Sequence, residues 1–335
     1  MTGSFDPTVR YAGPRAQFAS LTGSPLWGLS VSDIVKTFKD HGWRHNFGER
    51  LPTPFGLGPQ LNHFTTPDNR DVIWIPSYGM VQHEEFFTHE MERRAFWLLW
   101  QAGVQVLITG GTSGSADWRD PREADTVRPG DFVIPWSFYR GHEMVGTMPG
   151  TDMATGFLPR IALMGDPFCT SLSRELQRVV NDRLVPQPFR RAHHPGTVKV
   201  SIHPPGGHGS FETDFEVLTW RVLTQLISQQ EDFPHVVIFG DCISPILARQ
   251  MGMHLLYYHI PSNWAQGHPA TKEHLVDSLD ALYLDVLPQA CLELEMHLLA
   301  SVEIPTDCAC RSNLKSRPPV YMESVSPADN THNLS

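Results

Sequence analysis

An α/β fold built around one central sheet is predicted by three observations. Apolar runs of strand length alternate with amphipathic segments of helix length along the chain, as they do in α/β proteins. Neither an internal repeat nor a convincing linker divides this alternation into separate domains. The 335 residues, 41% of them hydrophobic, also suffice for one large core.

The clearest unit lies within residues 235–263 and comprises a strand at 236–239, a helix at 244–252 and a strand at 255–260. Pro245 in the first turn of the helix and Gly252 just after it are the residues expected at helix ends. We expect both strands to present their carboxyl ends at one edge of the sheet, where α/β proteins bind ligands. Asp241 and Asn263, which follow the two strands, are therefore the first candidates for a site.

The other elements follow from hydrophobic periodicity. Helices are expected over residues 31–38, 84–101, 171–184, 211–226 and 271–301, and strands over 72–76, 104–109, 131–135 and 196–203. Elsewhere within 26–70, glycine and proline interrupt the apolar pattern. We expect a flexible N-terminal arm at 1–20, a single α/β domain at 21–303, and a disordered tail at 304–335 that lacks apolar periodicity.

The bulk composition excludes two classes of partner. The formal net charge of −10 disfavours a nucleic-acid surface, which needs clustered lysine and arginine. No run approaches about 18 apolar residues, so no membrane span is expected, and the N-terminus lacks a basic-then-apolar secretory signal. The five cysteines are odd in number and irregularly spaced, which suits free thiols in a reducing compartment. We expect a cytoplasmic protein.

No metal or other cofactor is expected from the motifs. Cys308-Ala-Cys310 could be a redox or metal pair, but it lies in the polar tail. Histidines are numerous, 17 in all, yet His83-Glu84-Glu85 with His89 does not have the His-Glu-x-x-His spacing of a zinc-binding helix. His193 and His194 are adjacent and cannot both readily face one ion.

A glycine-rich segment, Gly110 to Ser115, follows the strand expected at 104–109. As a loop it could cradle an anion with its backbone N–H groups, and Thr112 would add a hydroxyl. The segment matches neither the P-loop nor the dinucleotide fingerprint. A tight turn without a ligand explains the composition equally well.

Seven short pieces occur in an order that resembles one enzyme superfamily. They are Thr53-Pro54-Phe55-Gly56, Gly103 with the strand after it, Gly114-Ser115, Arg128-Pro129-Gly130-Asp131-Phe132-Val133-Ile134, Asp166-Pro167-Phe168-Cys169, Gly196-Thr197 with the loop 202–213, and Leu247-Ala248-Arg249-Gln250-Met251-Gly252. Over about residues 20–300 they are similar to the purine nucleoside phosphorylase superfamily, nearest its methylthioadenosine phosphorylase branch. The resemblance implies a three-layer α/β sandwich around a distorted mixed sheet, assembled as a homotrimer. It also implies cleavage of an N-glycosidic bond with phosphate as the nucleophile.

The phosphate-binding residues that the resemblance implies are replaced in this chain. Ser77-Tyr78-Gly79 stands at the superfamily's Arg-His-Gly, Gly111 at a threonine, and Phe239-Gly240 at a Met-Thr pair. Thr22-Gly23-Ser24 only faintly matches the glycine-rich phosphate loop. Because phosphate needs a dense set of donors, and charged donors bind it most strongly, we expect a degenerate phosphate site.

The purine-binding residues differ as well. Asn263 and Ala265 stand at two aspartates that the methylthioadenosine branch uses to protonate and hold the base. An asparagine at the first position is similar to the guanine/hypoxanthine branch, since an amide serves both donor and acceptor edges. Without the carboxylates, an adenine leaving group has no obvious acid.

Three residues are candidate catalytic groups. Asp241 could be a general base, or simply the cap of the following helix. Glu212 matches a glutamate of the superfamily and could hold a sugar hydroxyl or water, or else be an acid favoured by a helix N-terminus. His208 stands where the superfamily has a small residue near the ribose, although an ordinary loop histidine explains it too.

The candidate substrate-binding residues come from several segments. They are Tyr78, His83, Gly111, Thr112, His203, Phe239 and Asn263. Tyr78 and Phe239 could fill the former phosphate and ribose space with apolar surface, and core packing explains them equally well. His83 matches a histidine of the superfamily and could contact the pocket or a neighbouring subunit.

Three functions remain open at this point. The first is an enzyme with the phosphorylase fold that does not use phosphate. Such an enzyme would hydrolyse an N-glycosidic bond, or cyclise or isomerise an apolar small molecule of secondary metabolism. The second is a non-catalytic paralogue that binds a small molecule. The third is an ordinary purine nucleoside or methylthioadenosine phosphorylase with compensating residues.

Overall fold

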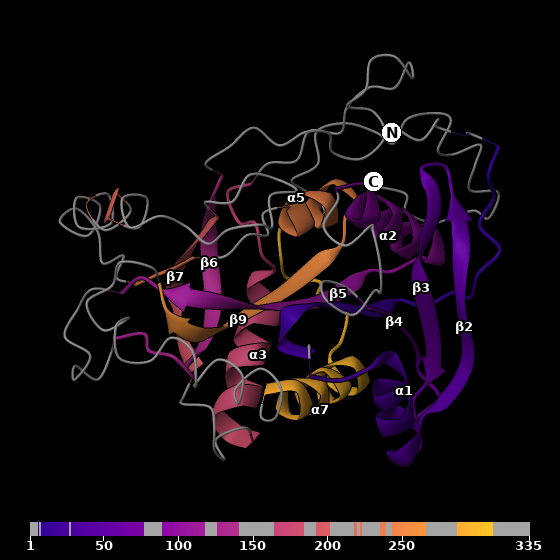
Figure 1. The fold of residues 1–335 in the computed structure, drawn as a ribbon, viewed down its shortest axis with the longest axis horizontal. Helices are drawn as coiled ribbons and strands as arrows, with labels where there is room; N and C mark the ends of the chain where they lie inside the picture. The colour runs from indigo at the N-terminus through magenta and orange to yellow at the C-terminus, as the bar shows by residue number, and fades with distance from the viewer. Residues whose placement is uncertain are drawn as a thin grey trace.

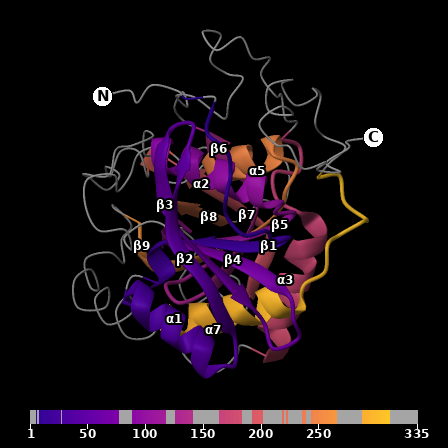
Figure 2. The same cartoon turned by 90° about the vertical axis from the view of Figure 1, so that its right-hand side faces the viewer.

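A sheet with helices on both faces is the centre of the computed structural model of the chain (Figures 1 and 2). The structure describes residues 6, 8–26, 28–76, 89–117, 126–140, 164–183, 192–201, 218, 219, 222, 235–238, 243–265 and 287–310. Among these residues, no helix is long and apolar enough to cross a membrane.

The described elements agree in type with most of the expected ones. The strands are β1 (Phe18–Thr22), β2 (Arg44–Thr53), β3 (Gly56–Thr65), β4 (Asp71–Pro76), β5 (Val106–Ser115), β6 (Phe132–Arg140), β7 (Ala192–Ser201), β8 (His235–Ile238) and β9 (His254–Trp264). The helices are α1 (Val31–Asp40), α2 (His89–Ala102), α3 (Thr170–Arg183), α5 (Ile243–Gln250) and α7 (Leu287–Ser301), with a 3-10 turn η1 (Ser24–Leu26). Gly103 follows α2 directly and has a φ of 87°, a left-handed conformation that commonly ends a helix.

The described strands form one mixed sheet in the order β2-β3-β4-β1-β5-β8-β7-β6-β9, and β5 also pairs with β9. On one side of β5 lies an open wing of β1, β4, β3 and β2. On the other side, the pairings of β5, β8, β7, β6 and β9 close a ring. Within the described sheet, β2 pairs only with β3 and is therefore the open edge.

Alternating side chains of the strands build one core on each face of the sheet. In β4, Val72 and Trp74 belong to the cluster with α1, α3 and α7, whereas Ile73 and Ile75 belong to the cluster with α2 and α5. Figure 1 shows α2 and α5 above the sheet and α1 and α7 below it. The expected three-layer sandwich around a mixed sheet is confirmed.

The strand–helix–strand unit of residues 235–263 is confirmed as β8, α5 and β9, although the two strands run in opposite directions relative to β5. β9 runs parallel to β5, whereas β8 runs antiparallel to it. The strand ends meet nevertheless, because Gly114 of β5 pairs with both Ile238 of β8 and Asn263 of β9. The closed ring of β5, β8, β7, β6 and β9 explains both the opposite directions of β8 and β9 and the meeting of their ends. A local sequence pattern carries no information about this closure.

Three strands near the N-terminus were not predicted. β1 begins at Phe18, inside the expected arm, and lies between β4 and β5 in the middle of the sheet. β2 and β3 form a hairpin that tolerates Pro52 because the register shifts between Arg50 and Pro52. At the other end, the described chain continues past residue 303, where we expected the domain to end, to Cys310, which is 2% exposed.

Candidate functional site

The glycine-rich segment that was expected as a loop is part of strand β5, so that expectation is wrong. Gly110 pairs with Tyr258, and the parallel pairing with β9 continues to Ser115 opposite Trp264. A Cβ added at Gly110 would lie 2.5 Å from two carbons of the Tyr258 ring. The absence of a side chain at Gly110 thus serves packing between strands.

Thr112 in β5 contacts the turn that follows β1. Its backbone N–H donates to Ser24 Oγ at 3.0 Å, and its hydroxyl donates to the same oxygen at 2.9 Å. Both side chains are buried. Ser24 belongs to the segment that we compared with the phosphate loop, and Thr112 follows Gly111, which stands at the superfamily's threonine. These two segments are therefore adjacent in space.

Asn263 lies at the end of β9 with an oriented amide. Its Nδ2 donates to the carbonyl oxygen of Trp264 at 2.7 Å, and its Oδ1 accepts from the Ser262 hydroxyl at 3.0 Å. The residue pairs with Gly114 and is half-buried. A carboxamide can make two donor and two acceptor contacts, so the Asn263 amide has further capacity on both atoms for a ligand.

We call the group Ser24, Gly111, Thr112, Ser262 and Asn263 the strand-end site. Its side chains carry hydroxyl and amide groups, and the segments 20–26, 109–116 and 260–265 that contribute them contain neither lysine nor arginine. These segments supply neutral donors and acceptors, which suit a polar uncharged ligand better than a multiply charged anion.

The structure does not describe the other seven predicted site residues. Asp241, Glu212, His208, Phe239, Tyr78, His83 and His203 lie outside the described residues. Of the sequence candidates, the structure brings together Gly111, Thr112 and Asn263, all from strands that pair with each other.

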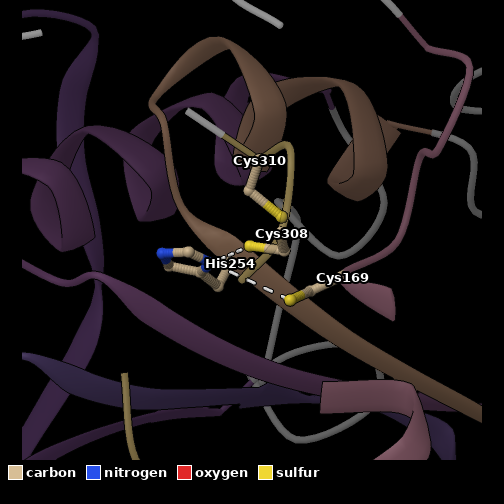
Figure 3. Close-up of side chains that lie close together, drawn as sticks. All are labelled: Cys169, His254, Cys308 and Cys310. Atoms are coloured by element: carbon tan, nitrogen blue, oxygen red, sulfur yellow. Dashed lines mark hydrogen bonds between the residues drawn. The ribbon is translucent and has the colours of Figure 1, made fainter. Parts of the chain in front are cut away.

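A second group of reactive side chains, which we call the thiol–imidazole cluster, joins Cys308 and Cys310 to two residues that sequence reasoning did not link to them. Cys169, His254, Cys308 and Cys310 offer one ligand atom each, and these four atoms all lie within 4.8 Å of one another (Figure 3). His254 Nδ1 is 3.1 Å from the Cys308 sulfur and 3.8 Å from the Cys169 sulfur. The structure therefore corrects the expectation that Cys308 and Cys310 belong to a disordered tail.

The contacts within the cluster shift the pKa values of its thiols in opposite directions. A hydrogen bond from Cys169 lowers the pKa of the Cys310 thiol to about 4, and His254 and Arg249 act in the same direction. The same contact with Cys310 raises the pKa of Cys169, and burial raises it further. Burial also raises the pKa of Cys308. Within the sequence only Cys308 and Cys310 are close to each other, and the other two members come from distant segments.

Comparison with solved structures identifies the fold. A methylthioadenosine phosphorylase from an antarctic soil metagenomic library matches with a TM-score of 0.66 and 17% identity, covering 96% of this chain and 98% of that one. Methylthioadenosine phosphorylase from Schistosoma mansoni in complex with adenine matches with a TM-score of 0.59 and 17% identity, covering 86% and 93%. A variant of the Schistosoma mansoni adenosine/methylthioadenosine phosphorylase in complex with methylthioadenosine matches with a TM-score of 0.57, 17% identity and the same coverage.

At these identities the comparison shows the fold alone. The resemblance to the nucleoside phosphorylase superfamily, nearest the methylthioadenosine branch, is confirmed at that level. No protein-family model matches the chain, and no curated protein is significantly similar to it in sequence.

Proposed function

We propose that this chain, which has the methylthioadenosine phosphorylase fold, binds a purine nucleoside and cleaves its N-glycosidic bond with water in place of phosphate. The observation that carries the proposal is the neutral character of the strand-end site. Inorganic phosphate is held best by charged donors, and the three segments of this site provide hydroxyls and an amide instead. A nucleoside, in contrast, offers hydroxyls and a base edge that pair well with such groups.

The similar structures support a nucleoside as the ligand class. The Schistosoma mansoni enzymes bind adenine and methylthioadenosine. In this chain, Asn263 would hold the base edge through the remaining donor and acceptor capacity of its amide. Asp241 or Glu212 would be the base that activates the water, and His208 a further group near the sugar. We also propose a homotrimer, on the sequence resemblance.

The proposal is tested by following release of the free base from inosine, guanosine, adenosine and methylthioadenosine, with and without phosphate. We expect release from at least one nucleoside at a rate that added phosphate changes by less than about twofold, since hydrolysis does not use phosphate. The sugar product should be the free sugar, not its 1-phosphate. Release that requires phosphate would instead identify a phosphorylase with replaced donors.

Two variants then identify the general base that activates the water. It is the carboxylate whose amide variant, Asp241→Asn or Glu212→Gln, abolishes release of the nucleobase while nucleoside binding persists in a thermal-shift assay. Failure of the wild-type chain to release the base from any of the four nucleosides would contradict the hydrolase. Binding of a nucleoside without release would favour the non-catalytic paralogue, and no binding would favour chemistry on another small molecule.

The Asn263→Asp variant should change base preference. A carboxylate accepts but does not donate, so the variant should lose preference for oxopurine nucleosides relative to adenosine by roughly tenfold, the size of one lost hydrogen bond to a buried partner. The measurement is the ratio of kcat/KM for inosine and adenosine, or of Kd if turnover is absent.

A matched control is Asn69→Asp, which makes the same change in the turn before β4, at the opposite end of the strands. Its base preference should equal that of the wild type. An Asn263→Asp ratio equal to that of Asn69→Asp would remove Asn263 from the base-binding site.

A further inference from the structure

The thiol–imidazole cluster has the donor set of a structural metal site. Three thiols and one imidazole form one of the common ligand combinations for zinc. They come from three parts of the chain: Cys169 immediately precedes α3, His254 opens β9, and Cys308 and Cys310 follow α7. Figure 3 shows the sulfur atoms of Cys169 and Cys308 turned toward the His254 ring, with Cys310 beside Cys308.

The spacing of the ligand atoms fits one ion. Zinc binds sulfur at about 2.3 Å, so a tetrahedral site separates its sulfur atoms by roughly 3.7 Å. The four atoms of the cluster lie within 4.8 Å of one another, and His254 Nδ1 is 3.1 Å from the Cys308 sulfur and 3.8 Å from the Cys169 sulfur. Shifts of less than about 1 Å would bring all four to zinc-binding distance, and the group is too compact to surround an iron–sulfur cluster.

Contacts outside the cluster hold these ligands in place. The Cys169 N–H donates to the carbonyl of Leu255 at 2.9 Å, and the His254 N–H donates to the carbonyl of Gln105 at 2.7 Å. The segment of Cys308 is attached to α3, because the Ser171 hydroxyl donates to Asp307 at 2.8 Å. The ligand positions are therefore prepared by the fold before an ion arrives.

The local charge also suits zinc. Three thiolates and one Zn²⁺ carry a net charge of −1, and the buried guanidinium of Arg249 acts electrostatically on Cys310. Arg249 is itself held in place, since it donates to the carbonyl of Asp166. A buried cation beside the site thus balances the charge that the occupied site would have, which lowers the cost of burial.

We propose that Cys169, His254, Cys308 and Cys310 bind one zinc ion that attaches the segment after α7 to β9 and α3. The site is structural, because four protein ligands fill the tetrahedral coordination and leave no position for a substrate. His254 and Asn263 occupy opposite ends of β9, roughly 30 Å apart at the rise of an extended strand. The zinc site is thus separate from the proposed nucleoside site and independent of it.

The first test is the metal content of the purified full-length chain by mass spectrometry, after expression with zinc and without chelator. We expect about one zinc per chain in the wild type and at least a tenfold loss in Cys308→Ala and Cys310→Ala. The matched control Cys291→Ala removes a buried thiol of α7 outside the cluster and should keep its zinc. Equal zinc in all four proteins, or a different metal in the wild type, would overturn the assignment.

The second test uses the wild type alone, so it does not depend on the folding of a variant. A strong chelator should lower Tm by on the order of 10 °C, and Zn²⁺ but not Mg²⁺ should restore it, because metal bound only to the folded state adds to stability. Co²⁺ added to the stripped protein should give the visible absorption of a tetrahedral site with thiolate ligands. Insensitivity to the chelator, or a disulfide that joins two of these cysteines in the native protein, would contradict the proposal.

Discussion

Replacement of Gly110 by alanine is expected to lower the stability of the fold by about 3 kcal/mol or more, at or beyond the upper end of the usual cost of overpacking. The added Cβ would lie 2.5 Å from Cε1 and Cε2 of Tyr258, a separation that real Cβ atoms essentially never show. The ring cannot move aside easily. It stacks on Phe132 with centroids 5.1 Å apart, and its hydroxyl donates to Glu295 at 2.7 Å.

The measurement is Tm and the urea midpoint of Gly110→Ala beside Gly165→Ala. A Cβ at Gly165 would meet nothing within 4 Å, so that variant should match the wild type. For a chain of 335 residues, a loss of about 3 kcal/mol corresponds to a decrease of roughly 4 °C in Tm. If Gly110→Ala does not fold at all, Gly110→Ala combined with Tyr258→Leu should recover soluble protein, because the ring is then absent. Equal stability of the Gly110 and Gly165 variants would show that the strands adjust to the methyl group.

The Glu295→Ala variant should lose a comparable amount of stability. Glu295 of α7 is 0% exposed, and its two oxygens accept hydrogen bonds from Ser20 of β1 at 2.6 Å and from Tyr258 of β9 at 2.7 Å. Each of these buried hydroxyls would lose its carboxylate acceptor, at a cost of about 1–3 kcal/mol apiece. A carboxylate in this position therefore joins α7 to two strands of the sheet.

The control for Glu295→Ala is Glu293→Ala, which lies on the same helix but is exposed and accepts a hydrogen bond from the Gln289 amide. We expect a Tm near that of the wild type for Glu293→Ala and a decrease of roughly 3–9 °C for Glu295→Ala. Glu295→Gln, which keeps one acceptor oxygen, should fall between them. The combination with Tyr258→Phe should be less than additive, because both changes remove the same hydrogen bond. Strict additivity would mean that this bond contributes nothing.

The elements that the sequence predicts well are those with a strong local pattern. The helix expected over 31–38 is α1, where Ser30 and Asp33 form a reciprocal capping pair that marks its start in the sequence. The strand expected over 255–260 is the centre of β9. In both cases the apolar spacing and the residues at the ends point to the same structure.

The elements that the sequence does not predict depend on distant partners. β5 continues through Gly110 and Gly111 because β9 pairs with it along its whole length, and local composition alone favours a turn there. Likewise, Cys308 and Cys310 acquire partners only because the segment after α7 returns to Cys169 and His254. Of the site, Asn263 at a strand end could be predicted from its position after an apolar run, whereas the hydroxyl contact between Ser24 and Thr112 could not.

The open edge at β2 has a consequence for how the molecule behaves at high concentration. An unpaired strand edge offers backbone groups to which a strand of another molecule can add, which is a route to aggregation. β2 opposes such addition, because its register shifts twice, it contains Pro52, and it carries the charged residues Arg44, Glu49 and Arg50. Ring closure removes the edge on the other side of the described sheet. An aggregate that grows by strand addition is thereby opposed at β2, and the closed ring of described strands offers it no free edge on the other side.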